Sequence, residues 1–246
     1  MKNSLNINKL NFSFGAFHIG PLTLSMEPGT VCLLTGPNGS GKSSIVNVLV
    51  ESYNNPNVDI TFDDKKDFRE DIGFIPDSFP FEMNYTPKMI ALLLSTIYKN
   101  WDWTTYQKLL DRFEIDPKQK FKKMSVGKLQ RFQVAIALSH QAKLLVFDEA
   151  TEGIDPATRY DIMQILNDYL YKFQASAVIS THNVQELGNR VDYVIYLQQG
   201  IPLIASDIES FYDEASTLLE KRDINGKVHS IHDFVEKMQG RRIHND

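Results

Sequence analysis

The chain has 246 residues, of which 42% are apolar and 23% are charged, and its formal net charge is −5. These values are ordinary for a globular protein with a substantial core, and the negative charge excludes a general attraction to nucleic acid or to anionic membranes. The single cysteine, Cys32, excludes an internal disulfide, which favours a cytoplasmic setting and a plain core role for this thiol.

Apolar stretches in the sequence fall well short of the roughly 20 residues that a membrane-spanning helix needs. The N-terminal residues also lack the apolar block of a signal peptide. We therefore expect the chain to stay outside the bilayer by itself, so that any work at a membrane needs other subunits to supply the span.

The first half of the chain predicts strands and then helices. Residues 5–35 alternate β-rich runs with turn signals, which predicts antiparallel strands that lead into a core strand at 31–35. Residues 54–71 are polar and broken, and another brief strand is expected at 72–76. Apolar residues then recur at helical spacing over 87–113, so we expect an inserted helical subdomain of about residues 80–140.

The second half alternates helices with short apolar strands. We expect a helix after Ser125, a strand at 143–147, a helix at 157–173, and strands at 177–180 and 193–197. Near-continuous apolar strands between helices indicate a mainly parallel sheet covered on both faces, in one domain over residues 1–246. Residues from about 206 to 246 form a C-terminal tail.

The strongest motif is the phosphate-binding loop pattern G-x-x-x-x-G-K-[ST], which residues 36–43 fit at every fixed position. Its glycines let backbone N–H groups surround phosphates, Lys42 reaches the outer phosphates, and the hydroxyl of Ser43 suits Mg²⁺. A simple Gly/Ser-rich turn is the alternative, which the flanking strand and helix disfavour. The residues predicted to bind a nucleoside triphosphate here are Gly36, Pro37, Asn38, Gly39, Ser40, Gly41, Lys42, Ser43 and Ser44.

Two adjacent carboxylates, Asp148 and Glu149, end the strand expected at 143–147. Ligands of α/β sheets bind at the carboxyl ends of strands, so both groups are placed for chemistry. Asp148 suits Mg²⁺, and Glu149 is placed to polarise an attacking water. A solvated pair of acids is the alternative, which the phosphate-binding loop makes the weaker one. We thus predict an α/β fold: a P-loop NTPase core with a mainly parallel sheet, an N-terminal antiparallel β subdomain and an inserted helical subdomain.

Further motifs give a specific resemblance, which covers residues 1–205. The chain resembles the nucleotide-binding subunit of an ATP-binding cassette (ABC) transporter. Phe14 stands where that family stacks an aromatic ring on adenine, and residues 124–130 occupy the place of the L-S-G-G-Q signature. Residues 152–155 resemble the segment that contacts the opposing subunit, and His182 matches the histidine that contacts the γ-phosphate. Out of this context, His182 would be a core or capping residue.

The resemblance implies an ATPase with Mg²⁺ as cofactor and with Glu149 and His182 as catalytic residues. Two such subunits face head to tail, so Ser125 and Gly127 of the signature would contact ATP on the partner, with the positive end of the following helix toward the γ-phosphate. The partners implied are a second cassette, in a homodimer or heterodimer, and membrane-spanning transporter subunits, with no nucleic acid. The location implied is peripheral, on the cytoplasmic face of a membrane.

Several positions depart from the family pattern. Asp77 replaces a glutamine that touches Mg²⁺, and we expect Asp77 to reach the metal directly or through water; a turn-forming aspartate is the alternative. Val126 replaces the first signature glycine, and a β-branched residue does not readily adopt φ > 0, so we expect a shifted loop. Lys128 replaces glutamine, and Ala150 stands where proline is common. Slow turnover, or pairing with a different cassette, follows from these departures.

Other functions stay open at this point. Residues 100–117 resemble small bacterial cassettes linked to export of antimicrobial peptides or drugs. A soluble cassette ATPase acting on ribosomes, nucleic acid or cofactor assembly is disfavoured by the absence of a second cassette or a large basic patch. A nucleotide-gated module with negligible hydrolysis is motivated by Asp77 and Val126.

For the aromatic pair Trp101 and Trp103 we favour packing over an interface. The C-terminal histidines favour solvated surface over a metal site: His229, His232 and His244.

Overall fold

A computed structural model describes residues 4–51, 58–149, 154–187, 190–224 and 226–240. Its centre is a six-stranded sheet in the order β5-β6-β7-β3-β8-β9, parallel except for the antiparallel edge strand β9. Every residue of β3, β6 and β7 is buried, which confirms the parallel sheet predicted from continuous apolar runs. The strands are β3 (Val31–Thr35), β5 (Ile72–Ile75), β6 (Leu144–Asp148), β7 (Ser176–Ser180), β8 (Tyr193–Gln198) and β9 (Ile201–Asp207).

A second, antiparallel sheet has the order β2-β1-β4. Strands β1 (Leu5–Phe14) and β2 (Phe17–Met26) form the predicted hairpin. Strand β4 (Val58–Phe62) corrects the expectation that residues 54–71 are broken. It alternates buried apolar with half-buried polar residues, and Ile60 pairs with Ile7 of β1. The period-2 pattern was too short, within a polar stretch, to be recognised.

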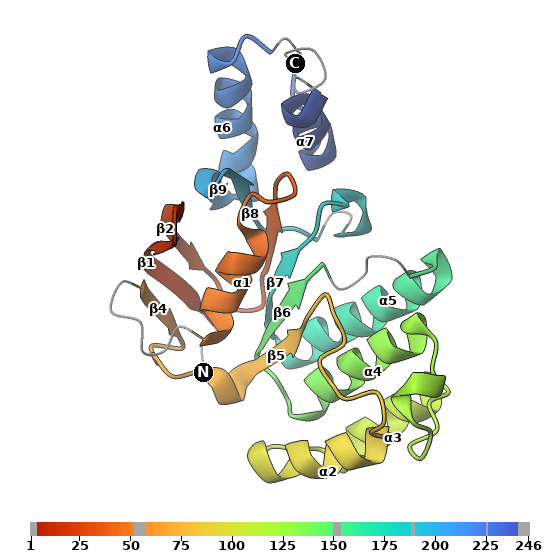
Figure 1. Ribbon diagram of the computed structural model, residues 1–246. Helices are drawn as coiled ribbons and strands as arrows, with labels where there is room; N and C mark the ends of the chain where they lie inside the picture. Colours follow the sequence, from red (N-terminus) through yellow and green to blue (C-terminus); the bar gives the residue numbers. More distant parts are fainter. Residues whose placement is uncertain (1–3, 52–57, 150–153, 188–189, 225, 241–246) are drawn as a thin grey trace.

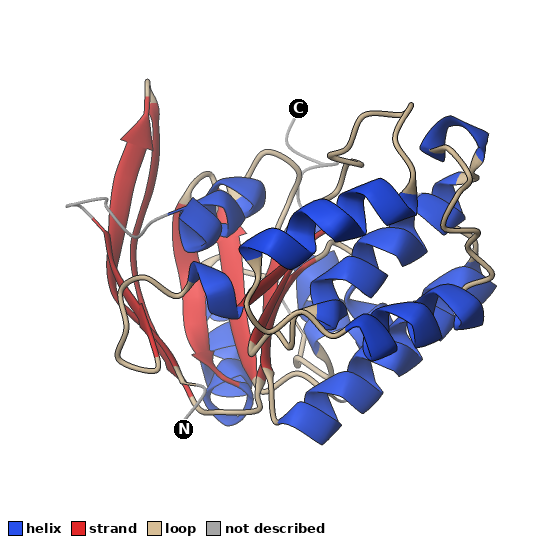
Figure 2. Cartoon of the chain, turned by 90° about the horizontal axis from the view of Figure 1, so that it is seen from below, coloured by secondary structure: helices blue, strands red, loops and turns tan. Residues whose placement is uncertain are grey.

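The helix α1 (Lys42–Glu51) lies between the two sheets, as Figure 1 shows. It packs with one face of the central sheet and the inner face of the N-terminal sheet in a single apolar cluster, to which β3 contributes Cys32 and Leu34. Val31 and Leu33, on the opposite face of β3, belong to a second cluster with the remaining helices. The central sheet is therefore covered on both faces, and Figure 2 shows the N-terminal sheet and the larger group of helices on opposite sides of it.

The middle third is helical, with α2 (Pro87–Ile97), α3 (Trp103–Arg112) and α4 (Val126–Ser139). Side chains of Thr86, Asp102 and Ser125 cap the N-termini of these helices, which fixes where each one begins. The break between α2 and α3 contains Trp101, which packs on the core, and its ring lies 5.7 Å from that of Trp103. Packing of both residues was expected; Trp101 packs on the core, whereas Trp103 is 46% exposed.

The rest of the chain is α5 (Pro156–Phe173) and two helices in the tail, α6 (Ile208–Lys221) and α7 (Ile231–Gly240). A short 3₁₀ helix, η4 (Val184–Leu187), follows β7. Among the residues that the structure describes, no helix combines the length and apolar character required to cross a membrane.

Candidate functional site

The phosphate-binding loop connects β3 to α1, and its backbone requires glycine at fixed points. Gly36 has φ +146°, and a Cβ there would lie 2.2 Å from the carbonyl oxygen of Leu197. Gly41 has φ +106°, with a side-chain atom of Ile19 at 3.0 Å from a built Cβ. The neighbouring Ser40 is held by two backbone hydrogen bonds, from its N–H to Pro37 at 3.1 Å and to its carbonyl from Gly200 at 2.8 Å. The loop is thus closely fitted between β8 and β2.

Lys42, the first residue of α1, is buried and points back into the loop. Its Nζ donates to the carbonyl oxygens of Gly36 at 3.1 Å and Pro37 at 3.3 Å. It also forms an ion pair with Glu149 Oε1 at 3.1 Å. This buried cation therefore connects the phosphate-binding loop to the end of β6.

Asp148, the last residue of β6, accepts a hydrogen bond from Ser43 Oγ at 3.1 Å. Burial raises the pKa of the Asp148 carboxyl, the charges of Asp77 and Glu149 raise it further, and the bond from Ser43 opposes the shift. Several carboxylates and one hydroxyl thus gather beside the loop, an oxygen-rich set that suits a hard cation.

Glu149 and His182 are brought together by the pairing of β6 with β7. Asp148 is in register with Ser180, and the N–H of Glu149 donates to the carbonyl of Ser180 at 3.0 Å. Glu149 Oε2 lies 3.6 Å from Nδ1 of His182, whose side chain is 44% exposed. Glu149 follows β6, His182 follows the adjacent strand β7, and Lys42 begins the helix after β3, the next strand in the sheet.

Lys42 and Glu149 border a cavity of about 370 Å³, which Asp148 and His182 do not line. Asp77, from the segment after β5, also lines it. Phe14, the residue predicted to stack on adenine, is exposed at the end of β1 and does not line this cavity. Phe17, which pairs with Phe14 across the hairpin turn, does line it. The sequence analysis missed Phe17, although an aromatic residue three positions after Phe14 was the signal that could have identified it. The lining residues are Phe17, Asn38, Gly39, Gly41, Lys42, Ser43, Ser44, Asp77 and Glu149.

Ser125 and Gly127 lie elsewhere, at the start of α4, and do not line the cavity. Ser125 caps the helix by accepting from the N–H of Lys128 at 3.3 Å, and Gly127 lies against Thr158 of α5. Val126 is the first helical residue and is 62% exposed. Its backbone is helical and does not have φ > 0, so the expectation that valine would shift the loop on this ground was wrong.

The segment expected to contact an opposing subunit is described only in part. Glu152 and Gly153 lie outside the described residues, as does Ala150. Ile154 is buried, and Asp155 caps α5 by accepting from the N–H of Thr158 at 3.0 Å. The start of α5 is therefore fixed beside the signature segment.

Comparisons with known proteins agree with this geometry. The family model for ABC transporters matches residues 19–152. The ABC transporter ATP-binding protein YtrB of Bacillus subtilis (strain 168) is 26% identical, over 78% of this chain and 68% of its own length. The lantibiotic transport ATP-binding protein SrtF of Streptococcus pyogenes is 27% identical, over 88% and 94%.

Solved structures show the same fold. The ATP-binding subunit of an ABC transporter superimposes with a TM-score of 0.77 at 18% identity, covering 95% of this chain and 99% of its own. A nucleotide-free ATP-binding cassette gives 0.69 at 21% identity, with 88% and 96% covered. Because the family model covers more than half of the chain, this protein belongs to the ABC transporter family, as an ATP-binding subunit that hydrolyses ATP to energise transport with separate membrane-spanning subunits.

Proposed function

We propose that this chain binds ATP with Mg²⁺ in the cavity beside the phosphate-binding loop and hydrolyses it there with Glu149 and His182. The observation that carries the proposal is the convergence of Lys42, Ser43 and Glu149 on one cavity, with His182 3.6 Å from Glu149. The cation and the loop N–H groups attract phosphate, while the carboxylates lie where a metal and a nucleophilic water are needed.

The residues present fit Mg²⁺. Ser43 and Asp148 offer oxygen ligands 3.1 Å apart, and Asp77 lines the same cavity. Within the described ranges, no three His, Cys, Asp or Glu side chains form a metal site by themselves. Mg²⁺ is commonly held by one or two carboxylates together with substrate phosphates, which this set allows. When bound, Mg²⁺ neutralises phosphate charge; Ser43 and Asp148 would hold it, with Asp77 direct or through water.

Each remaining side chain has a defined task in this proposal. Lys42 exchanges its carbonyl partners in the loop for phosphate oxygens. Glu149 removes a proton from the attacking water or orients it, a role that contributes about 10² to 10⁴ in rate. His182 contacts the γ-phosphate and holds Glu149 from the opposite side to Lys42.

A second cassette completes the site. Ser125 and Gly127 do not line the cavity of their own chain, and Val126 between them is largely exposed. We infer that this segment covers ATP bound to another cassette, a copy of this chain or a different one. Lys128 donates to the carbonyl of Glu114 at 2.8 Å, so its side chain is not free to fill the role of the usual glutamine without giving up this bond.

The membrane-spanning subunits dock, in this proposal, on the exposed apolar side of the helical region. Large apolar side chains on and before α2 are solvent-exposed, which is typical of a protein interface. The proposal includes a peripheral location of the chain on the cytoplasmic face of a membrane. The lantibiotic transport named for SrtF, together with the resemblance of residues 100–117, favours export of antimicrobial peptides or drugs. The exposed residues are Met83, Tyr85, Met89, Leu92, Leu93 and Ile97.

Glu149→Gln tests the proposal, because glutamine keeps size and hydrogen bonding but cannot accept a proton. We expect phosphate release to fall by about 10²- to 10⁴-fold while ATP still binds and ATP-bound dimers accumulate. Glu220→Gln, at an exposed position in α6, is the matched control and should keep parental turnover. Unchanged turnover in Glu149→Gln would remove Glu149 from the mechanism. Negligible hydrolysis by the parent with its membrane partner would instead favour a nucleotide-gated module.

A further inference from the structure

The segment that follows His182 packs against the C-terminal helix. Three residues join the end of β7 at Ser180 to η4, and His182 is the middle one. Helix α7, about 50 residues later in the sequence, contacts η4 directly. In Figure 1, α7 lies beside α6, over this part of the chain. The tail thus contacts the segment immediately after His182.

This contact is apolar and buried. Val184 and Leu187 of η4 are 5% and 6% exposed. They belong to the same apolar cluster as Ile231, Phe234 and Val235 of α7. The ring of Phe234 is fully buried and lies 5.0 Å from Tyr196 of β8, so α7 is anchored to the central sheet. Helix α7, anchored to the central sheet, therefore packs against η4.

The start of α7 is also fixed by polar contacts. The N–H of Asp233 donates to Ser230 Oγ at 3.0 Å, and Asp233 Oδ2 accepts from the N–H of His229 at 2.8 Å. Lys237 Nζ pairs with Asp233 at 2.9 Å and donates to the carbonyl of Lys227 at 2.7 Å. These bonds form a reciprocal cap, which gives Ile231, one residue after Ser230, a fixed position.

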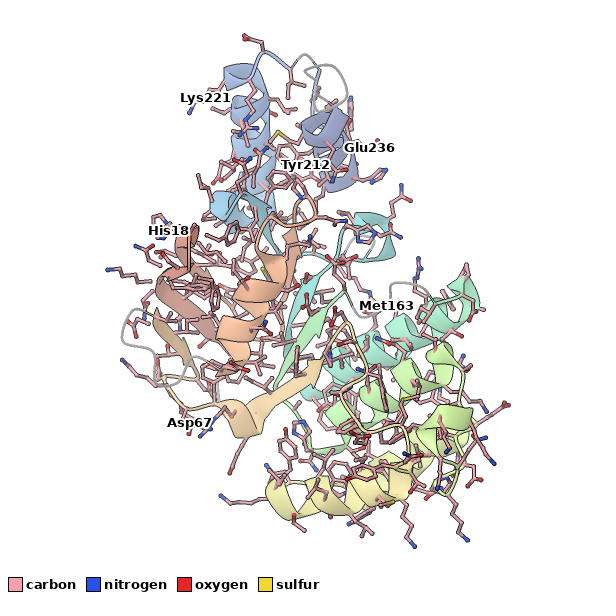
Figure 3. All side chains as sticks on the ribbon, viewed as in Figure 1. His18, Asp67, Met163, Tyr212, Lys221 and Glu236 are labelled. Carbon is pink, nitrogen blue, oxygen red and sulfur yellow. The ribbon has the colours of Figure 1, made fainter. Side chains whose placement is uncertain are left out.

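Part of η4 borders a cavity. A cavity of about 580 Å³ lies between η4, α6 and the start of α7, and Val184, Ile231 and Tyr212 line it. Tyr212 of α6 is marked in Figure 3, near α7. Because η4 has a cavity beside it, its packing on α7 is an important restraint on its position.

His182 depends on this restraint. Its ring is 44% exposed and lies 3.6 Å from Glu149. On the N-terminal side of His182, the N–H of Thr181 donates to the carbonyl of Leu34 at 3.2 Å and holds the backbone there. After His182, the N–H of Asn183 donates to Thr181 Oγ1 at 3.0 Å, and η4 begins at the next residue. Movement of η4 away from α7 would therefore carry the imidazole away from Glu149.

We propose that α7 is a positioning element for His182, acting through the packing of Ile231 and its neighbours on η4. The inference rests on the proposed role of His182 in hydrolysis. Ile231 touches neither ATP nor the reacting atoms and acts only by fixing the backbone after His182. Since small misplacements of a catalytic group lower rates strongly, loosening α7 should lower the rate of the chemical step and leave nucleotide affinity unchanged.

The test is a double-mutant cycle between Ile231 and His182, measured as single-turnover hydrolysis by the full chain with its membrane partner. Ile231→Ala should lower the rate constant about tenfold without changing the affinity for ATP. In the His182→Ala background, the same change should have no further effect, because the group that it positions is gone. Ile231→Val keeps most of the packing and should restore the parental rate.

Leu219→Ala is the matched control, since Leu219 is buried in α6 of the same tail cluster, and α6 packs mainly on β8 and β9. It should lower the unfolding midpoint about as much as Ile231→Ala while keeping the parental rate. The inference is overturned if Ile231→Ala keeps the parental rate, or if it slows hydrolysis equally with and without His182. If His182→Ala itself leaves the rate unchanged, the proposed role of His182 fails instead.

Discussion

Lys42→Ala tests the phosphate-binding site by removing its buried cation. In the structure, Lys42 Nζ lies within 3.3 Å of the carbonyls of Gly36 and Pro37 and of the carboxylate of Glu149. In the proposed function, phosphate oxygens replace the carbonyls as partners when nucleotide binds. The variant loses these contacts and leaves the carboxylate of Glu149 near the phosphates without its cation. Both effects weaken binding of ATP.

The size of the effect follows from the kind of contact that is lost. A hydrogen bond to a charged group contributes about 1.5–3 kcal/mol net. Because Lys42 already has partners in the structure, we count one such net gain and not the sum over all phosphate contacts. At about 1.4 kcal/mol per factor of ten, the dissociation constant for ATP should rise by about 10- to 150-fold.

Titration of a fluorescent ATP analogue onto the isolated chain measures this change directly. Lys66→Ala removes the same charge at a surface position, where the side chain is 73% exposed and pairs with Asp59, so its affinity should match the parent. Circular dichroism of both variants checks that each remains folded. If Lys42→Ala bound the analogue as tightly as the parent, the phosphate-binding assignment of residues 36–44 would be refuted.

Three further predictions follow from the same geometry. Ser125→Ala should leave ATP binding by an isolated chain unchanged and lower only hydrolysis that depends on a dimer; a loss of affinity in the isolated chain would contradict this. Asp77→Gln should change the Mg²⁺ concentration needed for half-maximal hydrolysis, whereas superimposable curves would make Asp77 a turn residue. Burial lowers the pKa of His140 to about 4 from 6.5, so the fold favours its neutral form. Stability should therefore fall as pH decreases from 6.5 toward 4, by about 2 kcal/mol at pH 5. His140→Phe, which retains a ring to stack on Tyr98, should show a flatter urea-unfolding profile over this pH range, and an unchanged profile would contradict the burial argument.

The parts of the fold that the sequence predicts well are those with a local cause. The central strands β3, β6 and β7 are short and wholly buried, and their residues are apolar except at the strand ends, so each is visible in its own residues. Strand β4 is stabilised by pairing with β1, about 50 residues earlier in the chain, and polar residues interrupt its apolar ones at Asp59 and Thr61. Its prediction required a contact that no local pattern contains.

The candidate site also combines features that the local sequence predicts with features that depend on distant contacts. The glycine pattern of the phosphate-binding loop predicts a local backbone, and three of its glycines, Gly36, Gly39 and Gly41, have φ > 0. The ion pair between Lys42 and Glu149 depends on how α1 lies against β6, which the sequence does not specify. The shifted loop at Val126 was predicted because the family has glycine there, which suggested a need for φ > 0. Val126 instead begins a helix and needs no special φ.

The backbone at Glu149 explains how two adjacent carboxylates serve one site. Side chains of consecutive residues in a strand point to opposite faces, so Asp148 and Glu149 would be expected to diverge. Glu149 instead has φ +48°, a left-handed conformation that is uncommon for a residue with a side chain. Asp148 meets Ser43 while Glu149 meets Lys42, and these two partners are themselves neighbours at the start of α1. The backbone strain at Glu149 is therefore located where it directs this carboxylate into the cavity that Lys42 and Ser43 line, and brings it within 3.6 Å of His182.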